Sequence, residues 1–365
     1  MKTQSLKPAV ALAAALLAES ALGQNPWTVV HEGDRPLNAV AFGDGLFVAV
    51  GDSGTVLTSP DGEDWTPRTL PAPADAALQS VVHGGGLWLA SGRTAGVLTS
   101  PDGIRWAWVP GSPTNLTALA HGNGVFVGVG QRRLWASTDG AKWDWVQRES
   151  GVMDRVLAFG GGWFVAKQAL SGDRLLASAN GTDWVDQPGP SPLNLYSIVY
   201  GDRQFLAIDS SNQAFTTSDF ESWTPGGWVQ GPRPSAAAHG MGVFAVAGGG
   251  DPEMSVDGSA WTFDRMSGGR ATRGLAYGAG GFVAVNFDGR IRRATNWLFL
   301  DTTGPGSLAI LGPGGGRYGI EARDSLDAAA SWSPVGEVRV GTNAEPWLDP
   351  DVSTRSGRFY RAVGP

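Results

Sequence analysis

Apolar and polar residues alternate in a pattern that recurs about every 38 residues through most of the chain. In the first unit, the segments 38–42, 46–50 and 55–58 are predicted strands, and a fourth strand begins at Trp65. The Gly-Asp-Gly sequence at 43–45 predicts a tight hairpin, because glycine tolerates the positive φ that such turns need. The segment 46–50 is apolar on both faces, so both faces must be covered by other parts of the protein.

Each of these units has a tryptophan at the start of its fourth predicted strand, and successive tryptophans are 36 to 41 residues apart. They are Trp65, Trp106, Trp143, Trp184, Trp223, Trp261 and Trp297. Units of four strands that stack around an axis predict an all-β fold, a β-propeller of about seven four-stranded blades. A β-helix would need shorter coils, and the 3.6-residue period of a helical solenoid is absent.

The residues before the first unit predict how the ring closes. Trp27 lies 38 residues before Trp65 and is therefore in phase with the repeat. We expect the segment 26–32 to be the outer strand of the last blade, which places the propeller at 24–298 with Trp297 leading out of it. An open ring and an eight-bladed ring are the competing interpretations.

Four units carry the motif Ser-x-Asp-Gly-x-x-Trp. The intact copies begin at Ser59, Ser100, Ser137 and Ser255. The motif resembles the Asp-box (BNR) repeat of sialidases, sortilin-type receptors and related propellers. It is most similar to the variant in bacterial secreted BNR-like propellers, and the resemblance covers 37 to about 298. It implies a propeller fold and says little about chemistry.

The repeated aspartates and tryptophans are interpreted as structural. Each carboxylate can accept hydrogen bonds from backbone N–H groups of its own turn, and each indole can cover the edge between neighbouring blades. Calcium binding or catalysis by the aspartates is the alternative. The residues assigned to this structural set are Asp61, Trp65, Asp102, Trp106, Asp139, Trp143, Trp184, Trp223, Asp257 and Trp261.

The repeat stops at about Phe299, and the segment 299–365 is predicted to be a small β module. The segments 317–326 and 358–363 are predicted strands, with Trp332 between them. The pattern is similar to the small β-sandwich tails that follow many exported propellers. The glycine run at 312–316 is interpreted as a turn, because no helix follows that could form a phosphate cradle.

The segment 1–23 has the features of a secretory signal peptide. Lys2 and Lys7 supply positive charge, 9–18 is a short apolar run, and Ala-Leu-Gly at 21–23 has the small-x-small form of a cleavage site. The apolar run is too short to span a bilayer as a stable helix. We therefore expect a soluble protein that is secreted or periplasmic.

Charge and cysteine content exclude several function classes. The net charge of −7 comes with no basic stripe, which argues against nucleic acid as a partner. The chain has no cysteine, so disulfides, thiolate metal sites and a cysteine nucleophile are excluded. No cofactor, metal site or membrane span is predicted, and the expected state is a monomer.

No catalytic constellation stands out among the polar residues. His83, His121 and His239 occupy a position that Phe or Tyr fills in the other units, so they are interpreted as packing residues beside a hairpin. No Gly-x-Ser-x-Gly elbow occurs in a strand-to-helix setting. The arginine triad and nucleophile pair that a sialidase would need are not found either. No catalytic residue is therefore assigned.

One position is polar in every unit but chemically different in each. It begins the predicted inner strand, which lines the channel of a propeller. A ring of unlike polar groups on a repetitive scaffold is where a ligand would be recognised, and a solvated channel mouth is the alternative. The candidate ligand-binding residues are Asn38, Gln79, Thr117, Arg155, Tyr196, Ser235 and Arg273.

The loops between the second and third strands are expected on the same face and vary as well. Their variable residues are Asp52, Arg93, Arg132, Lys167, Asp209, Asp251 and Asp288. Within the candidate ring, Arg155 and Arg273 are suited to meet an anion or a sugar carboxylate.

These observations favour an exported, non-enzymatic binding or scaffold propeller whose ligand is a glycan, a peptide or an envelope protein. The alternative is a carbohydrate-active enzyme, a glycoside hydrolase or lyase with its site at the channel mouth. That reading would need two carboxylates facing each other about 5–10 Å apart. A third reading, an assembly factor similar to the photosystem-assembly propellers with BNR-like blades, has no specific residues in its support.

Overall fold

The computed structural model divides into two compact units, which are described separately: Trp27–Ala294, and a smaller unit that includes Thr295–Pro365. The structure describes residues 27–72, 76–93, 96–131, 133–146, 152–168, 174–190, 195–261, 271–295, 299–304, 307–311, 317–323, 333–339, 345–348 and 359–363. The predicted signal peptide at 1–23 and Trp297 lie outside these residues. None of the described segments is a helix with the length and apolar character needed to cross a membrane.

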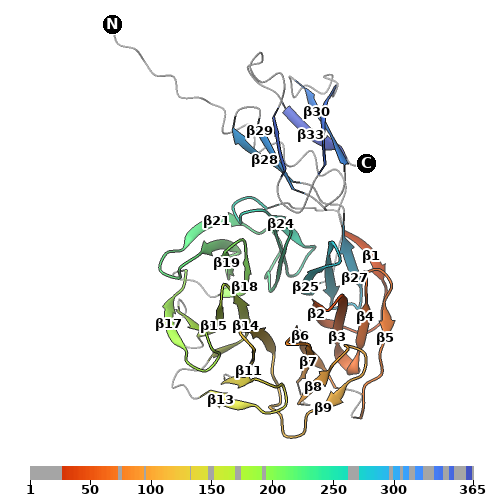
Figure 1. The fold of residues 1–365 in the computed structure, drawn as a ribbon, viewed down its shortest axis with the longest axis vertical. Helices are drawn as coiled ribbons and strands as arrows, with labels where there is room; N and C mark the ends of the chain where they lie inside the picture. Colours follow the sequence, from red (N-terminus) through yellow and green to blue (C-terminus); the bar gives the residue numbers. More distant parts are fainter. Residues whose placement is uncertain are drawn as a thin grey trace. The chain divides into compact units, whose positions relative to one another are not determined.

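The larger unit is a seven-bladed β-propeller, which confirms the predicted fold class. Its seven antiparallel sheets are arranged around a common axis (Figure 1). Six sheets have four strands, and the described part of the sixth blade has three.

The blades follow the order of the chain. Blade 1 contains β2 (Leu37–Gly43), β3 (Leu46–Gly51), β4 (Val56–Ser59) and β5 (Thr66–Pro67), with a 3₁₀ turn η1 (Asp52–Gly54) after β3. Blade 2 contains β6 (Leu78–Gly84), β7 (Leu87–Gly92), β8 (Val97–Ser100) and β9 (Ala107–Trp108). Blade 3 contains β10 (Ala118–Gly122), β11 (Val125–Gly130), β12 (Arg133–Ser137) and β13 (Asp144–Val146). Blade 4 contains β14 (Val152–Gly160), β15 (Trp163–Gln168), β16 (Arg174–Ser178) and β17 (Val185–Pro188). Blade 5 contains β18 (Leu195–Gly201), β19 (Gln204–Asp209), β20 (Gln213–Thr217) and β21 (Thr224–Trp228). Blade 6 contains β22 (Ala236–Gly240), β23 (Val243–Ala247) and β24 (Glu253–Ser255). Blade 7 contains β25 (Thr272–Gly278), β26 (Gly281–Asn286), β27 (Ile291–Ala294) and β1 (Trp27–His31).

The hydrophobic core lies between blades. Val48 and Val50 of β3 pack in one cluster with Leu78 and Trp88 of blade 2, and similar clusters join other neighbouring blades. β3, for example, contributes Val48 and Val50 to one cluster and Phe47 and Ala49 to another. A second strand that is buried on both faces is apolar at nearly every position.

An aromatic or imidazole side chain near the end of each first strand packs against the preceding blade. His83 lies over Gly43, and the series returns to Phe42, which lies over Gly278. A Cβ atom at Gly43 would be 2.3 Å from the His83 ring, so only glycine allows this approach. His83 also stacks on Trp88 of its own blade, with ring centroids 4.7 Å apart.

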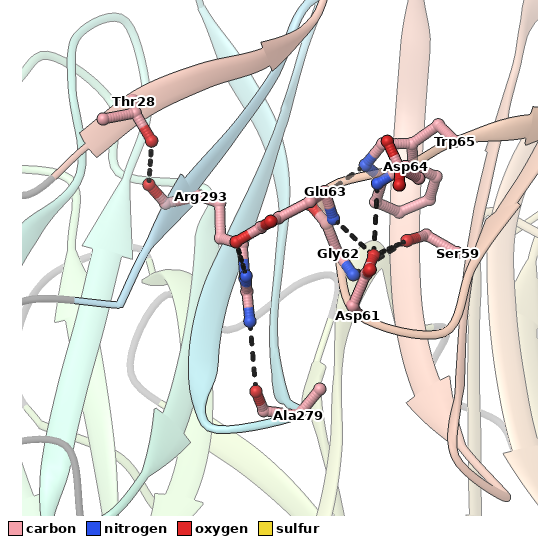
Figure 2. Close-up of polar contacts among 9 residues, drawn as sticks. All are labelled: Thr28, Ser59, Asp61, Gly62, Glu63, Asp64, Trp65, Ala279 and Arg293. Carbon is pink, nitrogen blue, oxygen red and sulfur yellow. Dashed lines mark hydrogen bonds and ion pairs between the residues drawn. The ribbon is translucent and has the colours of Figure 1, made fainter.

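The turn between the third and fourth strands is closed by its aspartate. In blade 1, Asp61 Oδ1 accepts hydrogen bonds from the backbone N–H groups of Glu63 at 2.9 Å and Asp64 at 3.1 Å (Figure 2). The bond from Glu63, followed by that from Asp64, lowers the pKa of Asp61 below its ordinary value. Trp65 Nε1 donates to the Gly62 carbonyl oxygen at 3.1 Å. Equivalent turns are built on Asp102, Asp139, Asn180, Asp219 and Asp257.

The ring is closed by the N-terminal strand. β1 pairs antiparallel with β27, with Trp27 opposite Ala294, and is thus the outer strand of blade 7. Arg293 of β27 reaches across to blade 1, where its guanidinium pairs with Glu63 (Figure 2). The same guanidinium donates to the Ala279 carbonyl oxygen at 3.1 Å. The strand that precedes blade 1 in the chain is therefore part of the sheet of blade 7, and an ion pair links the two blades.

The smaller unit contains two three-stranded antiparallel sheets. One has the order β28 (Phe299–Gly304), β29 (Ser307–Leu311), β32 (Glu345–Leu348), and the other has the order β31 (Ser333–Arg339), β30 (Arg317–Arg323), β33 (Phe359–Val363). The sheets meet where Gly336 faces Trp347, since a Cβ atom at Gly336 would lie 2.7 Å from the indole nitrogen.

Candidate functional site

The seven candidate ligand-binding residues lie where the inner strand of each blade begins. This is the end of the blade opposite the hairpin that joins the first and second strands. The side chain of the residue from blade 4, Arg155, lies outside the described residues. Their positions are Asn38 in β2, Gln79 in β6, Thr117 before β10, Arg155 in β14, Tyr196 in β18, Ser235 before β22 and Arg273 in β25.

Four of these residues stand at a β-bulge. In blade 1, the register with β3 shifts between Leu37 and Ala39, which leaves Asn38 as an extra residue in the ladder. The register shifts in the same way around Gln79 and Arg273. A bulge bends its strand and re-aims a side chain, and bulges are over-represented beside binding sites. Blade 5 has the same bulge, whereas the register of the first two strands is continuous in blades 3 and 6.

The bulged residues of blades 7, 1 and 2 line one cavity of about 220 Å³. These blades are neighbours in the ring, so the cavity spans two blade interfaces. Three of the seven candidate residues are thus brought together, and Thr117, Tyr196 and Ser235 are not part of the lining. The lining consists of Asn38, Asp52, Ala77, Gln79, Arg93, Arg273 and Phe287.

Arg273 presents a cation that is held on an aromatic face. Its guanidinium carbon lies 5.0 Å from the centroid of the Phe287 ring, which is a cation–π geometry. The Nε of Arg273 is buried and has no hydrogen-bond partner among the described residues. Within that part of the chain, neither Arg273 nor the exposed Arg93 forms an ion pair. The cavity therefore holds two guanidinium groups that form no ion pair with a described residue.

Asp52 supplies a carboxylate that is fixed by Asn38. The Asn38 amide nitrogen donates to Asp52 Oδ1 at 2.8 Å and to the Leu78 carbonyl oxygen at 2.8 Å. Because Leu78 belongs to blade 2, this amide also connects blades 1 and 2. Asp52 is half-buried and forms no ion pair with a described residue.

Two other residues that the sequence placed in these loops are used by the fold, and one of them, Asp209, is the last residue of β19 and not a loop residue. Asp251 pairs with Arg292 of blade 7, and both side chains are nearly inaccessible. Asp209 accepts hydrogen bonds from the backbone N–H groups of Ser211 at 2.8 Å and Gln213 at 2.9 Å. Their carboxylates therefore stabilise blade edges, and the cavity does not include them.

Lys167 is not a loop residue, which corrects the placement expected from the sequence. It lies within β15 and is buried, and this burial lowers the pKa of its ammonium group. Asp288 lies 3.9 Å from Arg290. Arg132 lies outside the described residues.

The histidines form contacts between blades on the hairpin side. His83 Nε2 lies 3.2 Å from Asp44 of the preceding blade, and His239 Nε2 lies 3.0 Å from Asp202. Burial, with a smaller effect of the neighbouring His83, lowers the pKa of His121. Among the described residues, no group of three or more His, Cys, Asp or Glu side chains is placed to hold a metal ion.

Sequence reasoning missed Ala77 and Phe287. Phe287 is 44 % exposed, and it follows the second strand of blade 7, where the other units have polar residues, glycine or alanine. This departure from the repeat could have identified Phe287 as a candidate site residue, since residues of a binding site often differ from the repeat that carries them. No comparable signal marks Ala77.

No family model matches the chain, and no curated protein matches its sequence. Many solved structures share its fold. YCF48 bound to a D1 peptide is 19 % identical, with a TM-score of 0.61 over 77 % of this chain and 98 % of that one. A catalytically inactive virginiamycin B lyase from Staphylococcus aureus, solved with quinupristin, is 12 % identical, with a TM-score of 0.62 over 73 % and 97 %. The WD40 propeller domain of Doa1 is 13 % identical, with a TM-score of 0.58 over 73 % and 94 %. At such identities the likeness shows the fold alone, a β-propeller.

Proposed function

We propose that this protein is an exported binding propeller and that the cavity between blades 7, 1 and 2 holds an anionic group of its ligand. The observation that carries the proposal is the presence of Arg93 and Arg273 in one cavity without an ion-pair partner among the described residues. A guanidinium offers a rigid fork of donors that matches a carboxylate or a phosphate. The two charges therefore favour an anion over a neutral group.

A peptide or protein segment is the first ligand class to test. The structurally similar YCF48 was solved with a bound peptide, so this fold can present a peptide-binding surface. Glycans and envelope proteins are the other classes that suit an exported propeller. The carboxylate side chains of acidic peptides and the carboxylates of acidic sugars would meet the arginines in the same way.

Glycoside hydrolysis has less support from the cavity. That chemistry needs a pair of carboxylates flanking the scissile bond. Among the described residues that line the cavity, Asp52 alone carries a carboxylate, and its Oδ1 is bound by the Asn38 amide.

A binding screen of the purified protein against peptide and glycan arrays tests the proposal. Arg273→Ala is the test variant, and Arg290→Ala is the matched control. Arg290 is another arginine of blade 7, but it is exposed, lies 3.6 Å from Glu32 and is outside the cavity. We expect an acidic ligand that loses at least about tenfold in affinity with Arg273→Ala and keeps its affinity with Arg290→Ala. Unchanged binding by Arg273→Ala, with both variants melting like the wild type, would remove the cavity as the site.

Export and a relationship to Asp-box propellers belong to the same proposal. Export is supported by the charged and apolar pattern of 1–23, and the relationship by the repeated aspartate turns, such as the one on Asp61. Expression in a bacterial host followed by N-terminal sequencing tests export. A processed chain beginning at Gln24 outside the cytoplasm is expected, and an intact cytoplasmic chain would contradict it.

A further inference from the structure

We infer that the group taken by this cavity is a zwitterion, in which an anionic group and a protonated amine lie close together, as in an α-amino acid. The inference rests on the proposed function, because it assigns the chemistry of the ligand in the same cavity. The cavity of about 220 Å³ contains charges of both signs, Arg93 and Arg273 on one hand and Asp52 on the other.

These charges do not satisfy one another. No ion pair joins Asp52 to either arginine in the described part of the chain. A ligand with only an anionic group would gain from the arginines and be repelled by Asp52. An amine beside that anionic group converts the repulsion into attraction, so a zwitterion complements the whole cavity.

The surroundings of Asp52 are suited to an ammonium group. The Asn38 amide uses its nitrogen for Asp52 and Leu78, which leaves the Asn38 carbonyl oxygen as a second acceptor beside the carboxylate. An ammonium group has three donors and no acceptor. Acceptors are therefore available next to Asp52, and donors are available at the arginines.

Phe287 adds an apolar surface beside Arg273. Its ring carries the guanidinium on one face and is still 44 % exposed. An aromatic or apolar side chain on the ligand would cover this exposed surface. L-Phenylalanine is thus a suitable probe, because it combines both charges with an aromatic group.

Isothermal titration calorimetry with three related probes separates the contributions. L-Phenylalanine carries both charges, 3-phenylpropionate carries the carboxylate alone, and phenethylamine carries the amine alone. We expect L-phenylalanine to bind the wild type at least about tenfold more tightly than either of the others. Equal affinity for L-phenylalanine and 3-phenylpropionate would overturn the inference.

Asp52→Asn is the test variant, because it removes the charge and keeps an oxygen for the Asn38 amide. It should lower the affinity for L-phenylalanine about tenfold or more and leave the affinity for 3-phenylpropionate equal or higher. Arg273→Ala should lower the affinity for both L-phenylalanine and 3-phenylpropionate, and Arg290→Ala should change neither affinity. If Asp52→Asn changes nothing while Arg273→Ala still weakens the acids, the zwitterion is wrong and the anion-binding function stands.

Two capped tripeptides distinguish a free amino acid from a protein segment as the source of the charges. Acetyl-Glu-Phe-Lys-amide carries both charges on side chains, and acetyl-Glu-Phe-Gln-amide carries only the negative one. Tighter binding of the lysine peptide that is lost in Asp52→Asn assigns the zwitterion to a protein segment. If neither L-phenylalanine nor the lysine peptide binds at millimolar concentration, the inference is overturned. The Arg273 dependence of any array ligand then decides the proposed function separately.

Discussion

Asp61 and Asp52 are both carboxylates near a turn of blade 1, yet the fold uses them differently. The Asp61 carboxylate accepts two backbone N–H bonds from its own turn, so its charge stabilises local structure. The Asp52 carboxylate is bound by a side-chain amide at one oxygen and lines the cavity. The turn motif uses the Asp61 carboxylate for its own backbone hydrogen bonds. The Asp52 carboxylate, which is held by the bulged residue Asn38, is available for a ligand.

The turn aspartates should make stability depend on acid pH. Backbone N–H bonds lower the pKa of Asp61, Asp139 and Asp219 below the ordinary value of 3.8. A lowered folded-state pKa contributes stability that is present above pH 3.8 and is lost as the pH falls below it. Replacing all three by Asn should keep the fold at pH 7 and flatten the fall in melting temperature below about pH 4.

Asn180 is the natural control for that experiment. Its Oδ1 accepts the N–H groups of Thr182 at 3.0 Å and Asp183 at 2.8 Å, which are the equivalents of the two bonds that Asp61 accepts in blade 1. The triple Asn variant is compared with a triple Ala variant, which should melt lower at pH 7 because the turn bonds are gone. An acid dependence as steep in the Asn variant as in the wild type would show that other groups titrate.

At the scale of the strand and blade, tryptophan acts at the interface between blades. Trp106 is 7 % exposed and packs in the cluster that joins blades 1 and 2, and its Nε1 donates to the Gly103 carbonyl oxygen at 3.0 Å. In blade 5, Phe220 occupies the glycine position of the turn, and Trp223 Nε1 donates instead to the Pro188 carbonyl oxygen at 3.0 Å. Trp223 still packs against the cluster that joins blades 4 and 5, so the packing position is kept where the turn differs.

Trp106→Ala should lower the free energy of unfolding by about 3–5 kcal/mol, because it removes a buried aromatic group and leaves a cavity. Trp145→Ala is the control, since Trp145 is 46 % exposed on an outer strand. Its loss should cost about 1 kcal/mol or less, mostly its cation–π contact with Arg133. Urea unfolding measures both, and equal losses would contradict the role of Trp106 between blades.

The repeat allowed the blades to be predicted from the sequence. The site could be predicted only in part, because it depends on local bulges that interrupt the repeat. The hairpin glycines follow from local turn geometry, and the apolar second strands follow from burial on both faces of the sheet. The cavity depends on bulges at Asn38, Gln79 and Arg273, which require knowledge of strand register. It also depends on blades 7 and 1 meeting, and Asn38 and Arg273 are far apart in the sequence. The sequence could therefore name seven equivalent residues but not the three that share a cavity.

At the scale of the whole ring, β27 is held from both sides. Successive residues of a strand point to opposite faces, and Arg292 pairs with Asp251 of blade 6 while Arg293 pairs with Glu63 of blade 1. The first pair is buried on both sides, whereas Glu63 is largely exposed. Loss of Asp251 would leave Arg292 as an uncompensated buried charge, so this contact is the stronger tie.

The N-terminal strand should contribute more to closure than any single ion pair. A chain that begins at residue 35 lacks β1, leaves the edge of β27 unpaired and loses the buried Trp27. Loss of a buried tryptophan alone costs about 3–5 kcal/mol, so the melting temperature should fall on the order of 10 °C relative to a chain that begins at residue 24. β1 is held by its pairing with β27. A synthetic peptide of residues 24–34, added in excess to the shortened chain, should therefore bind β27 and restore part of the lost melting temperature by mass action. Equal melting temperatures for the two chains would mean that the ring is closed by blade packing and not by the shared sheet.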